Sequence, residues 1–221
     1  MRTVLVTGGS RGIGKAICER FALAGDTVIA PARGELELSD AASVEAFVSA
    51  NRARTFDVIV NNAGINDIHG IEEITDEEIE RTLAINLVAP IRLLRGLVGG
   101  MKRAGGGHIV NIGSIWAVVS KAGRTMYAAS KNGIHGVTNT LAVELAPYNI
   151  LVNTVCPGFT LTELTRKNNS PEQIASISRD IPMGRMAQPE EIAEVVYFLC
   201  SAQNTYLTGQ KITVDGGFAE K

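Results

Sequence analysis

A tyrosine and a lysine stand four residues apart in the segment Tyr127-Ala128-Ala129-Ser130-Lys131. If this segment is helical, the two side chains lie on one face of the helix. A free phenol has a pKa of about 10, so under about 1% of it is ionised at neutral pH. A neighbouring ammonium favours the phenolate, and lowering the pKa to about 8 needs about 2.7 kcal/mol. We therefore predict that Tyr127 is a general acid and base for an alcohol–ketone pair.

A serine precedes this tyrosine by 13 residues and follows the expected strand His108–Ile112. Open α/β sheets bind ligands beyond the carboxyl ends of their strands. The hydroxyl of Ser114 is therefore expected at the ligand-binding edge, where it can form a hydrogen bond with a substrate oxygen.

Asn86 is a further candidate, because it is a polar residue in the apolar helical run 83–88. Pro90 follows four residues later and has no N–H group, so the carbonyl of Asn86 loses its helical partner. We expect the helix to kink there, and the free carbonyl to bind an ordered water.

The segment Thr7-Gly8-Gly9-Ser10-Arg11-Gly12-Ile13-Gly14 connects the first expected strand to the first expected helix. Glycines in such a turn allow a pyrophosphate to approach the backbone, and the helix N-terminus supplies free N–H groups. This context predicts a dinucleotide site. Its candidate residues in this loop are Gly8, Ser10, Arg11, Gly12, Ile13 and Gly14.

The end of the second expected strand bears on which dinucleotide binds. It reads Ile29-Ala30-Pro31-Ala32-Arg33, without the acidic residue that NAD sites place near the ribose 2′-hydroxyl. Arg33 and Arg11 are cations that can reach a 2′-phosphate. The sequence therefore favours NADP as the cofactor, with NAD still possible.

Short β-branched runs alternate with segments of helical periodicity along the whole chain. Runs that are apolar on both faces are typical of parallel strands covered on each side. Thr75-Asp76-Glu77-Glu78 is a capping box that begins a helix, and prolines in the first turn begin helices near Pro171 and Pro189. The expected strands are 3–7, 27–30, 36–38, 58–61, 108–112, 150–155 and 211–214, with helices at 13–23 and 43–50.

This alternation predicts an α/β fold, a single doubly wound (Rossmann) domain over residues 1–221 with a mainly parallel sheet of about seven strands. Between the second and third strands only residues 31–35 are available, although a parallel crossover needs a dozen or more. The fold is therefore expected to be reduced at this point, unless the third strand is absent.

The composition excludes several other classes of protein. The chain has 221 residues, is 45% hydrophobic and carries a net charge of −2, so it has no basic field for nucleic acid. Its longest apolar runs are strand-sized, which argues against a membrane span. Cys18, Cys156 and Cys200 are far apart, which is typical of free thiols in the cytoplasm. The histidines do not cluster with them, and no metal site is expected.

Taken together, these motifs resemble the short-chain dehydrogenase/reductase family over essentially the whole chain. The matching segments are the glycine loop 7–14, Asn61-Asn62-Ala63-Gly64, Ser114, Tyr127 with Lys131, Pro157-Gly158 and Val214-Asp215-Gly216-Gly217. The resemblance implies an NAD(P)-dependent oxidoreductase acting on a carbonyl or secondary alcohol, with the catalytic residues Asn86, Ser114, Tyr127 and Lys131.

The resemblance also implies roles for individual residues. Tyr127 would donate the proton, Ser114 would polarise the carbonyl, and Lys131 would bind the nicotinamide ribose and lower the tyrosine pKa. Asn86 would hold a water that passes protons to Lys131. The further cofactor-binding residues would be Glu37 and Leu38 at the adenine, Asn61, Ala63 and Gly64 along the adenosine side, and Pro157, Gly158 and Thr162 at the nicotinamide.

Within the family, the segment 157–217 is most similar to 3-oxoacyl-(acyl carrier protein) reductases. A sugar or polyol dehydrogenase of the same family is an alternative, and a non-catalytic dinucleotide-binding regulatory module is an alternative of another class. A sugar epimerase of the extended branch would need a large carboxyl-terminal domain, but only 90 residues follow Lys131. Residues 161–185 are expected to form a mobile substrate lid, and the helices at 75–103 and 125–146 to pair in a homodimer or homotetramer.

Overall fold

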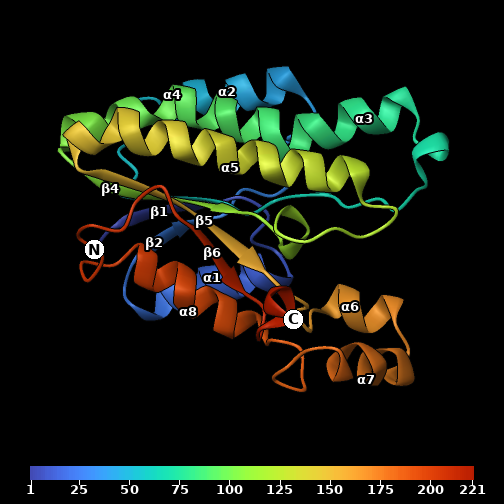
Figure 1. The fold of residues 1–221 in the computed structure, drawn as a ribbon. Helices are drawn as coiled ribbons and strands as arrows, with labels where there is room; N and C mark the ends of the chain where they lie inside the picture. Colours follow the sequence, from blue (N-terminus) through green and yellow to red (C-terminus); the bar gives the residue numbers. More distant parts are fainter.

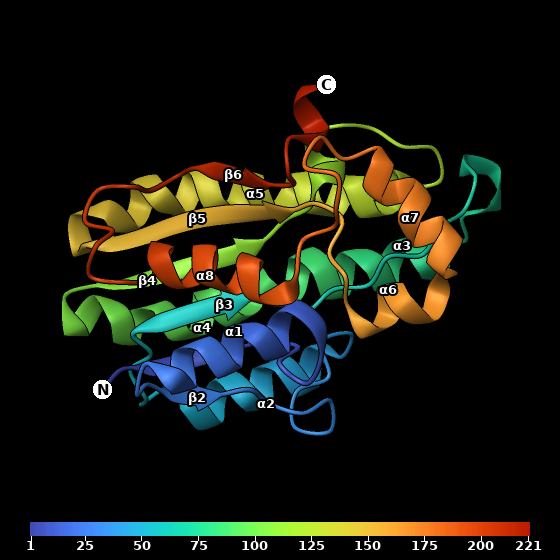
Figure 2. The same cartoon turned by 90° about the horizontal axis from the view of Figure 1, so that it is seen from below.

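The computed structural model describes residues 1–221, apart from the side chains of Leu164 and Asn168. Its described residues form one parallel sheet in the order β2-β1-β3-β4-β5-β6, with helices on both faces (Figures 1 and 2). The strands are β1 (Thr3–Val6), β2 (Thr27–Ile29), β3 (Val58–Asn61), β4 (Gly107–Ile112), β5 (Ile150–Pro157) and β6 (Lys211–Val214). The doubly wound α/β class predicted from the alternating pattern is confirmed.

Helices α2, α4 and α5 cover one face of this sheet, while α1 and α8 cover the other (Figure 1). Their bounds are α1 (Gly12–Leu23), α2 (Ala41–Asn51), α3 (Asp76–Leu83), α4 (Ala89–Ala104), α5 (Thr125–Leu145), α6 (Glu163–Asn168), α7 (Pro171–Arg179) and α8 (Pro189–Leu199). Single turns lie at Ile71–Glu73, Ile115–Ala117, Ala146–Tyr148 and Phe218–Glu220, and a π-helical segment at Ala84–Val88. Helices α6 and α7 extend beyond the carboxyl ends of the strands (Figure 2).

The local signals for helix starts are confirmed. The Thr75 hydroxyl accepts a hydrogen bond from the Glu78 N–H at 3.2 Å, and the Glu78 carboxylate accepts one from the Thr75 N–H at 3.2 Å. This capping box begins α3. Pro171 and Pro189 each occupy the first turn of a helix, as expected.

The third strand expected at 36–38 is wrong, and the described residues form six strands rather than seven. The chain leaves β2 and crosses directly to α2 through the irregular segment 30–40. Leu36 is buried in the core beneath α2 and α4, and Leu38 packs against that core. The alternating apolar pattern there therefore reflects two core contacts rather than strand pairing, because the available chain is too short for a parallel crossover.

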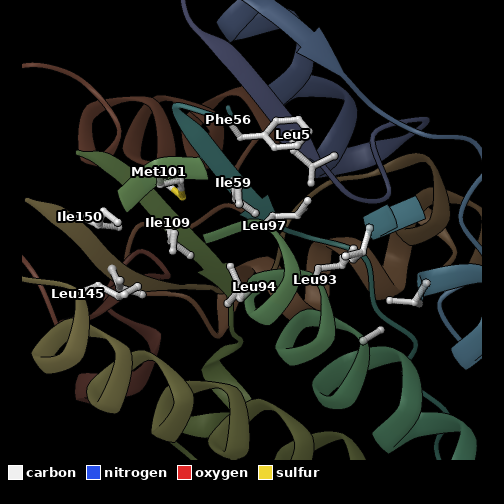
Figure 3. Packing of buried hydrophobic residues seen from close by; sticks show 14 of the residues in the cluster. Leu5, Phe56, Ile59, Leu93, Leu94, Leu97, Met101, Ile109, Leu145 and Ile150 are labelled. Atoms are coloured by element: carbon white, nitrogen blue, oxygen red, sulfur yellow. The ribbon is translucent and has the colours of Figure 1, made fainter. Parts of the chain in front are cut away.

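The core between the sheet and α4 is built from large aliphatic side chains and Phe56 (Figure 3). Leu93, Leu97 and Met101 extend from α4 toward the sheet residues Leu5 and Ile59, and all five are 0–1% exposed. These contacts hold α4 against this face of the sheet.

The stretch Asp76–Ala104 is a continuous 29-residue helical segment with a mean hydropathy of 1.4 in its most apolar window, 44% of which is buried. By length and composition it could cross a membrane, so the expectation that every apolar run is strand-sized is wrong. The apolar face of its α4 portion packs against the sheet, and a core helix meets the same criteria.

Gly96 is where α4 passes closest to α2. A Cβ atom at Gly96 would lie 2.2 Å from Cγ1 of Val48, which is buried in α2, whereas one at Gly99 would meet only the end of Arg103 at 3.4 Å. We expect Gly96→Ala to lower the free energy of unfolding by about 1–3 kcal/mol through overpacking. The matched change Gly99→Ala should raise it by about 0.5–1 kcal/mol through helix propensity. Urea denaturation measures both, and equal effects would contradict this account of the α2–α4 contact.

Candidate active site

A cavity of about 480 Å³ opens at the carboxyl edge of the sheet, above β1 and β3. This volume suits a small-molecule or cofactor site. Among the residues predicted for the cofactor, it is lined by Gly8, Ser10, Arg11, Gly12, Ile13, Gly14, Arg33, Glu37, Leu38, Ala63, Gly64 and Thr162. The cavity also involves residues that the sequence did not single out, namely Pro31, Ala32, Leu36, Asn62, Ile65, Ile85 and Glu163.

The glycine loop has the geometry that an extended anionic ligand needs. Gly8 and Gly12 have φ angles of +67° and +55°, and a Cβ atom at Gly14 would lie 2.2 Å from the Gly8 carbonyl oxygen. Helix α1 begins at Gly12 without a side-chain cap and without an acidic residue in its first turn. Its N–H groups and the positive end of its dipole are therefore free to bind a diphosphate.

Asn62, rather than the predicted Asn61, holds this loop. The Asn62 amide donates to the carbonyl oxygens of Thr7 at 2.9 Å and Gly8 at 3.2 Å. Asn61 is 4% exposed in β3, where its amide donates to Oδ1 of Asn111 at 2.8 Å, and it does not line the cavity. The two roles follow from strand alternation: the last residue of β3 points into the sheet core, and the next one reaches the loop.

Arg33 and Glu37 lie together on the rim of the cavity, with Nε and Oε2 separated by 3.2 Å. The Glu37 carboxylate also accepts hydrogen bonds from the backbone N–H of Ser39 at 3.0 Å and from its hydroxyl at 2.7 Å. These bonds, with the charge of Arg33, lower the pKa of Glu37. The rim therefore presents a fixed carboxylate beside an Arg33 guanidinium that is 81% exposed.

Lys131 brings a buried amine next to Gly64 in the cavity wall. It is 3% exposed, and its Nζ donates to the carbonyl oxygen of Ile112 at 2.7 Å. A Cβ atom at Gly64, which lines the cavity, would lie 3.3 Å from this Nζ and 3.2 Å from Oδ1 of Asn86. Burial lowers the pKa of Lys131 from 10.5 to about 8. The amine beside the cavity wall is therefore close to titration at physiological pH.

The Tyr127 phenol is placed beside Lys131 and Ser114. Nζ of Lys131 lies 5.7 Å from the centroid of the tyrosine ring. Burial raises the pKa of Tyr127, although the Ser114 side chain and the charge of Arg124 act to lower it. The expected lowering by Lys131 is therefore wrong for the protein alone: the amine lies over the ring and is bound to Ile112, while loss of hydration disfavours the phenolate.

The side chain of Asn86 acts as a clamp rather than only exposing a carbonyl. Its Oδ1 accepts from the Ile65 N–H at 2.9 Å, and its Nδ2 donates to the Ile65 carbonyl at 2.9 Å and to the Ser130 hydroxyl at 3.0 Å. Ser130 in turn donates to the Tyr127 carbonyl at 2.8 Å. Asn86 lies in the π-helical segment Ala84–Val88, so the helix is irregular where Pro90 predicted a kink.

The remaining predicted residues lie outside the large cavity. Tyr127 lines a much smaller pocket beside it, with Asp67, His69 and Glu78. Pro157 ends β5, and the Gly158 N–H donates to the Val214 carbonyl at 2.9 Å. A Cβ atom at Gly158 would lie 2.6 Å from Asp215, so this glycine permits a close chain crossing. Ser130 and Asn62 were missed by the sequence reasoning, although each stands beside a residue that was named.

Comparison with known proteins agrees with this geometry. The family described as "short chain dehydrogenase" matches residues 2–46, and the one described as "Enoyl-(Acyl carrier protein) reductase" matches residues 30–219. The chain is 36% identical over 236 residues to the 3-oxoacyl-[acyl-carrier-protein] reductase FabG of Vibrio harveyi, covering 98% of this chain and 96% of that protein.

Solved structures are similar over the same extent. A short chain dehydrogenase family protein from Francisella tularensis is 34% identical with a TM-score of 0.93, and the match covers 100% of both chains. A gluconate 5-dehydrogenase from Burkholderia cenocepacia, solved with NADP and tartrate, is 25% identical with a TM-score of 0.87, covering 100% of this chain and 96% of that one. The protein therefore belongs to the short-chain dehydrogenase/reductase family.

Proposed function

We propose that this oxidoreductase interconverts a carbonyl and a secondary alcohol, with NADP(H) as cofactor and Tyr127 as general acid and base. The single observation that carries the proposal is that Lys131 lies beside the Tyr127 ring while its Nζ is next to Gly64 in the cavity wall, with Ser114 also acting on the phenol. The glycine loop and the free N-terminus of α1 fit a dinucleotide diphosphate. The bound nicotinamide would supply or accept the hydride.

The roles of the residues follow from their surroundings. Tyr127 is protonated at neutral pH because burial raises its pKa, so it can donate a proton to a carbonyl oxygen. The Ser114 hydroxyl, which acts to lower the pKa of the Tyr127 phenol, would hold the same oxygen. Lys131 would bind a ribose hydroxyl and return a proton, and Asn86 keeps the Ile65 loop and α5 in register around it.

Two substrate classes are in view. The similarity to 3-oxoacyl-[acyl-carrier-protein] reductases supports a 3-oxoacyl group. The similarity to a gluconate 5-dehydrogenase supports a sugar or polyol acid. At the turn 147–149, where carrier-protein reductases usually place a basic residue, this chain has Pro147, Tyr148 and Asn149. The ammonium of nearby Lys102 lies 4.4 Å from the centroid of the Tyr148 ring. The lack of a basic residue at this turn favours a sugar or polyol acid as the substrate.

The surrounding elements have roles in the same proposal. Helices α6 and α7 lie beyond the carboxyl edge and would form a substrate lid over residues 161–185 (Figure 2). Val143 on α5 is 77% exposed and Ile91 on α4 is 39% exposed, which supports pairing of these helices in a homo-oligomer. Cys18, Cys156 and Cys200 are free thiols, which supports a cytoplasmic location.

Cofactor choice can be tested at the cavity rim. We expect NADPH to bind more tightly than NADH in fluorescence titrations, because Arg33 and Arg11 face the cavity. Arg33→Ser should weaken NADPH binding about tenfold and leave NADH binding nearly unchanged, since a charge-assisted hydrogen bond is lost only with the 2′-phosphate. Glu37→Gln is the matched control: it should strengthen NADPH binding by removing the fixed carboxylate. Equal effects of Arg33→Ser on both cofactors would contradict NADP selection.

The acid–base role of Tyr127 can be tested with Tyr127→Phe. This variant keeps the ring but loses the transferable proton, so kcat for carbonyl reduction should fall about 100- to 10,000-fold. Its Kd for NADPH should stay close to that of the wild type. Ser114→Ala serves as the comparison, with a smaller fall because the proton donor remains. Full reductase activity in Tyr127→Phe would refute the mechanism and favour a non-catalytic dinucleotide-binding module.

The buried amine of Lys131 predicts a specific dependence of stability on pH. Its pKa falls from 10.5 to about 8 on folding, which corresponds to about 3 kcal/mol in favour of the neutral amine. Between these values the unfolded chain binds more protons, so this group makes stability rise with pH from about 8 to 10.5. We expect Lys131→Met to be more stable than wild type at pH 7, with a difference that shrinks toward pH 10. Urea denaturation from pH 7 to pH 10 measures this. A constant difference in the free energy of unfolding between variant and wild type would contradict the lowered pKa of Lys131.

A further inference from the structure

Arg124 is a guanidinium beside Tyr127 that the mechanism does not use. It is the residue just before α5 and lies three positions before the tyrosine. Its Nη1 donates to Oδ1 of Asn66 at 2.5 Å, while its Nε is buried without a partner among the described residues. A buried donor without an acceptor is costly, so it indicates either strain or a missing ligand. The positive charge of Arg124 opposes the rise that burial causes in the pKa of Tyr127.

The other charged groups near this position are already paired. Arg81 binds Asp67 at 2.6 Å, and Nδ1 of His69 lies 2.8 Å from Glu78. The first turn of α5 has no acidic residue. Among the described side chains, Arg124 therefore has a neutral amide as its hydrogen-bonding partner and no carboxylate within 4.0 Å. A partly desolvated cation without a counter-ion attracts an anion.

The guanidinium is held by the same elements that position Tyr127. Its partner Asn66 follows Ile65, whose backbone is bound on both sides by the Asn86 side chain. Asn86 also binds Ser130, which donates to the Tyr127 carbonyl. The positions of the guanidinium and of the reacting phenol are therefore coupled through one set of hydrogen bonds, as a residue that orients a substrate requires.

We propose that Arg124 binds a carboxylate of the substrate, so that this enzyme acts on oxo acids and hydroxy acids rather than on neutral acyl thioesters. The inference rests on the proposed function and selects between its two substrate classes. With Nη1 held by Asn66 and Nε buried, Nη2 is the guanidinium donor left for a substrate, and a charge-assisted hydrogen bond from it suits one oxygen of a carboxylate.

A matched pair of substrates tests this inference: acetoacetate and its neutral ethyl ester, each reduced with NADPH. The two present the same ketone and differ in the charge of one group. Arg124→Met should lower kcat/KM for acetoacetate about 10- to 100-fold, mainly through KM, because a charge-assisted contact is lost. The same variant should change kcat/KM for the ester by less than about threefold. Arg124→Lys should recover part of the loss.

Arg95→Met is the control variant. It removes the same charge from an exposed position on α4, where the side chain is 70% exposed, and it should change neither substrate. Thermal unfolding of each variant separates loss of binding from loss of folding. If Arg124→Met lowers kcat/KM equally for both substrates, Arg124 acts through Tyr127 or the fold rather than on a carboxylate. This result would overturn the assignment.

Failure of this inference can be distinguished from failure of the proposed function. If wild type reduces the ester in a Tyr127-dependent manner but prefers it to acetoacetate, the carboxylate site is wrong and the reductase proposal stands. If neither compound is reduced, calorimetric titration of acetoacetate into the enzyme with NADP decides the inference alone. Binding that is lost in Arg124→Met and kept in Arg95→Met supports the site, and absence of binding to wild type refutes it.

Discussion

The hydrogen bond from the Lys131 ammonium to the Ile112 carbonyl ties the middle of α5 to the carboxyl end of β4. It forms where Lys131 is almost fully buried, so one carbonyl must replace most of the water that the amine loses. Gly64 makes room for this arrangement, because any side chain there would meet both Nζ of Lys131 and Oδ1 of Asn86. The buried position of Lys131 therefore requires a glycine at position 64.

The architecture brings these residues together at the point where the strand order reverses. β1 pairs with β2 on one side and with β3 on the other, so the loops that follow β1 and β3 diverge and leave a crevice between them. The glycine loop, Asn62 and Gly64 all lie at this crevice. The short connection after β2 leads directly to α2 without a further strand, and the reversal of strand order between β1 and β3 is present. The sheet edge can thus be reduced without loss of the cavity.

Much of this organisation could be predicted from local sequence. The capping box at Thr75, the prolines at 171 and 189, and the glycine loop each specify a backbone conformation by their own chemistry, and each appears as expected. The alternating residues 36–38 led to the wrong prediction of a strand. A pattern of three residues is too short to separate a strand from two side chains that contact the core.

Other features depend on tertiary contacts that no short segment encodes. Asn62 rather than Asn61 binds the glycine loop because β3 ends at Asn61, and the position of this strand end depends on tertiary contacts. The raised pKa of Tyr127 depends on burial by elements distant in sequence, as does the pairing of Arg124 with Asn66 across 58 residues. Spacing alone placed Lys131 beside the tyrosine, but it could not show that the amine lies over the ring and binds Ile112.

The opposite shifts of the two titrating groups have a consequence for the direction of the reaction. Burial raises the pKa of Tyr127 from its ordinary value and lowers that of Lys131 to about 8, so the ammonium is the stronger acid of the pair. At neutral pH the protein alone therefore holds a neutral phenol beside a charged amine. Donation of a proton to a carbonyl oxygen starts from this state without prior ionisation, whereas alcohol oxidation first requires a phenolate. In the proposed mechanism, carbonyl reduction therefore starts from the protonation state that burial favours in the protein alone.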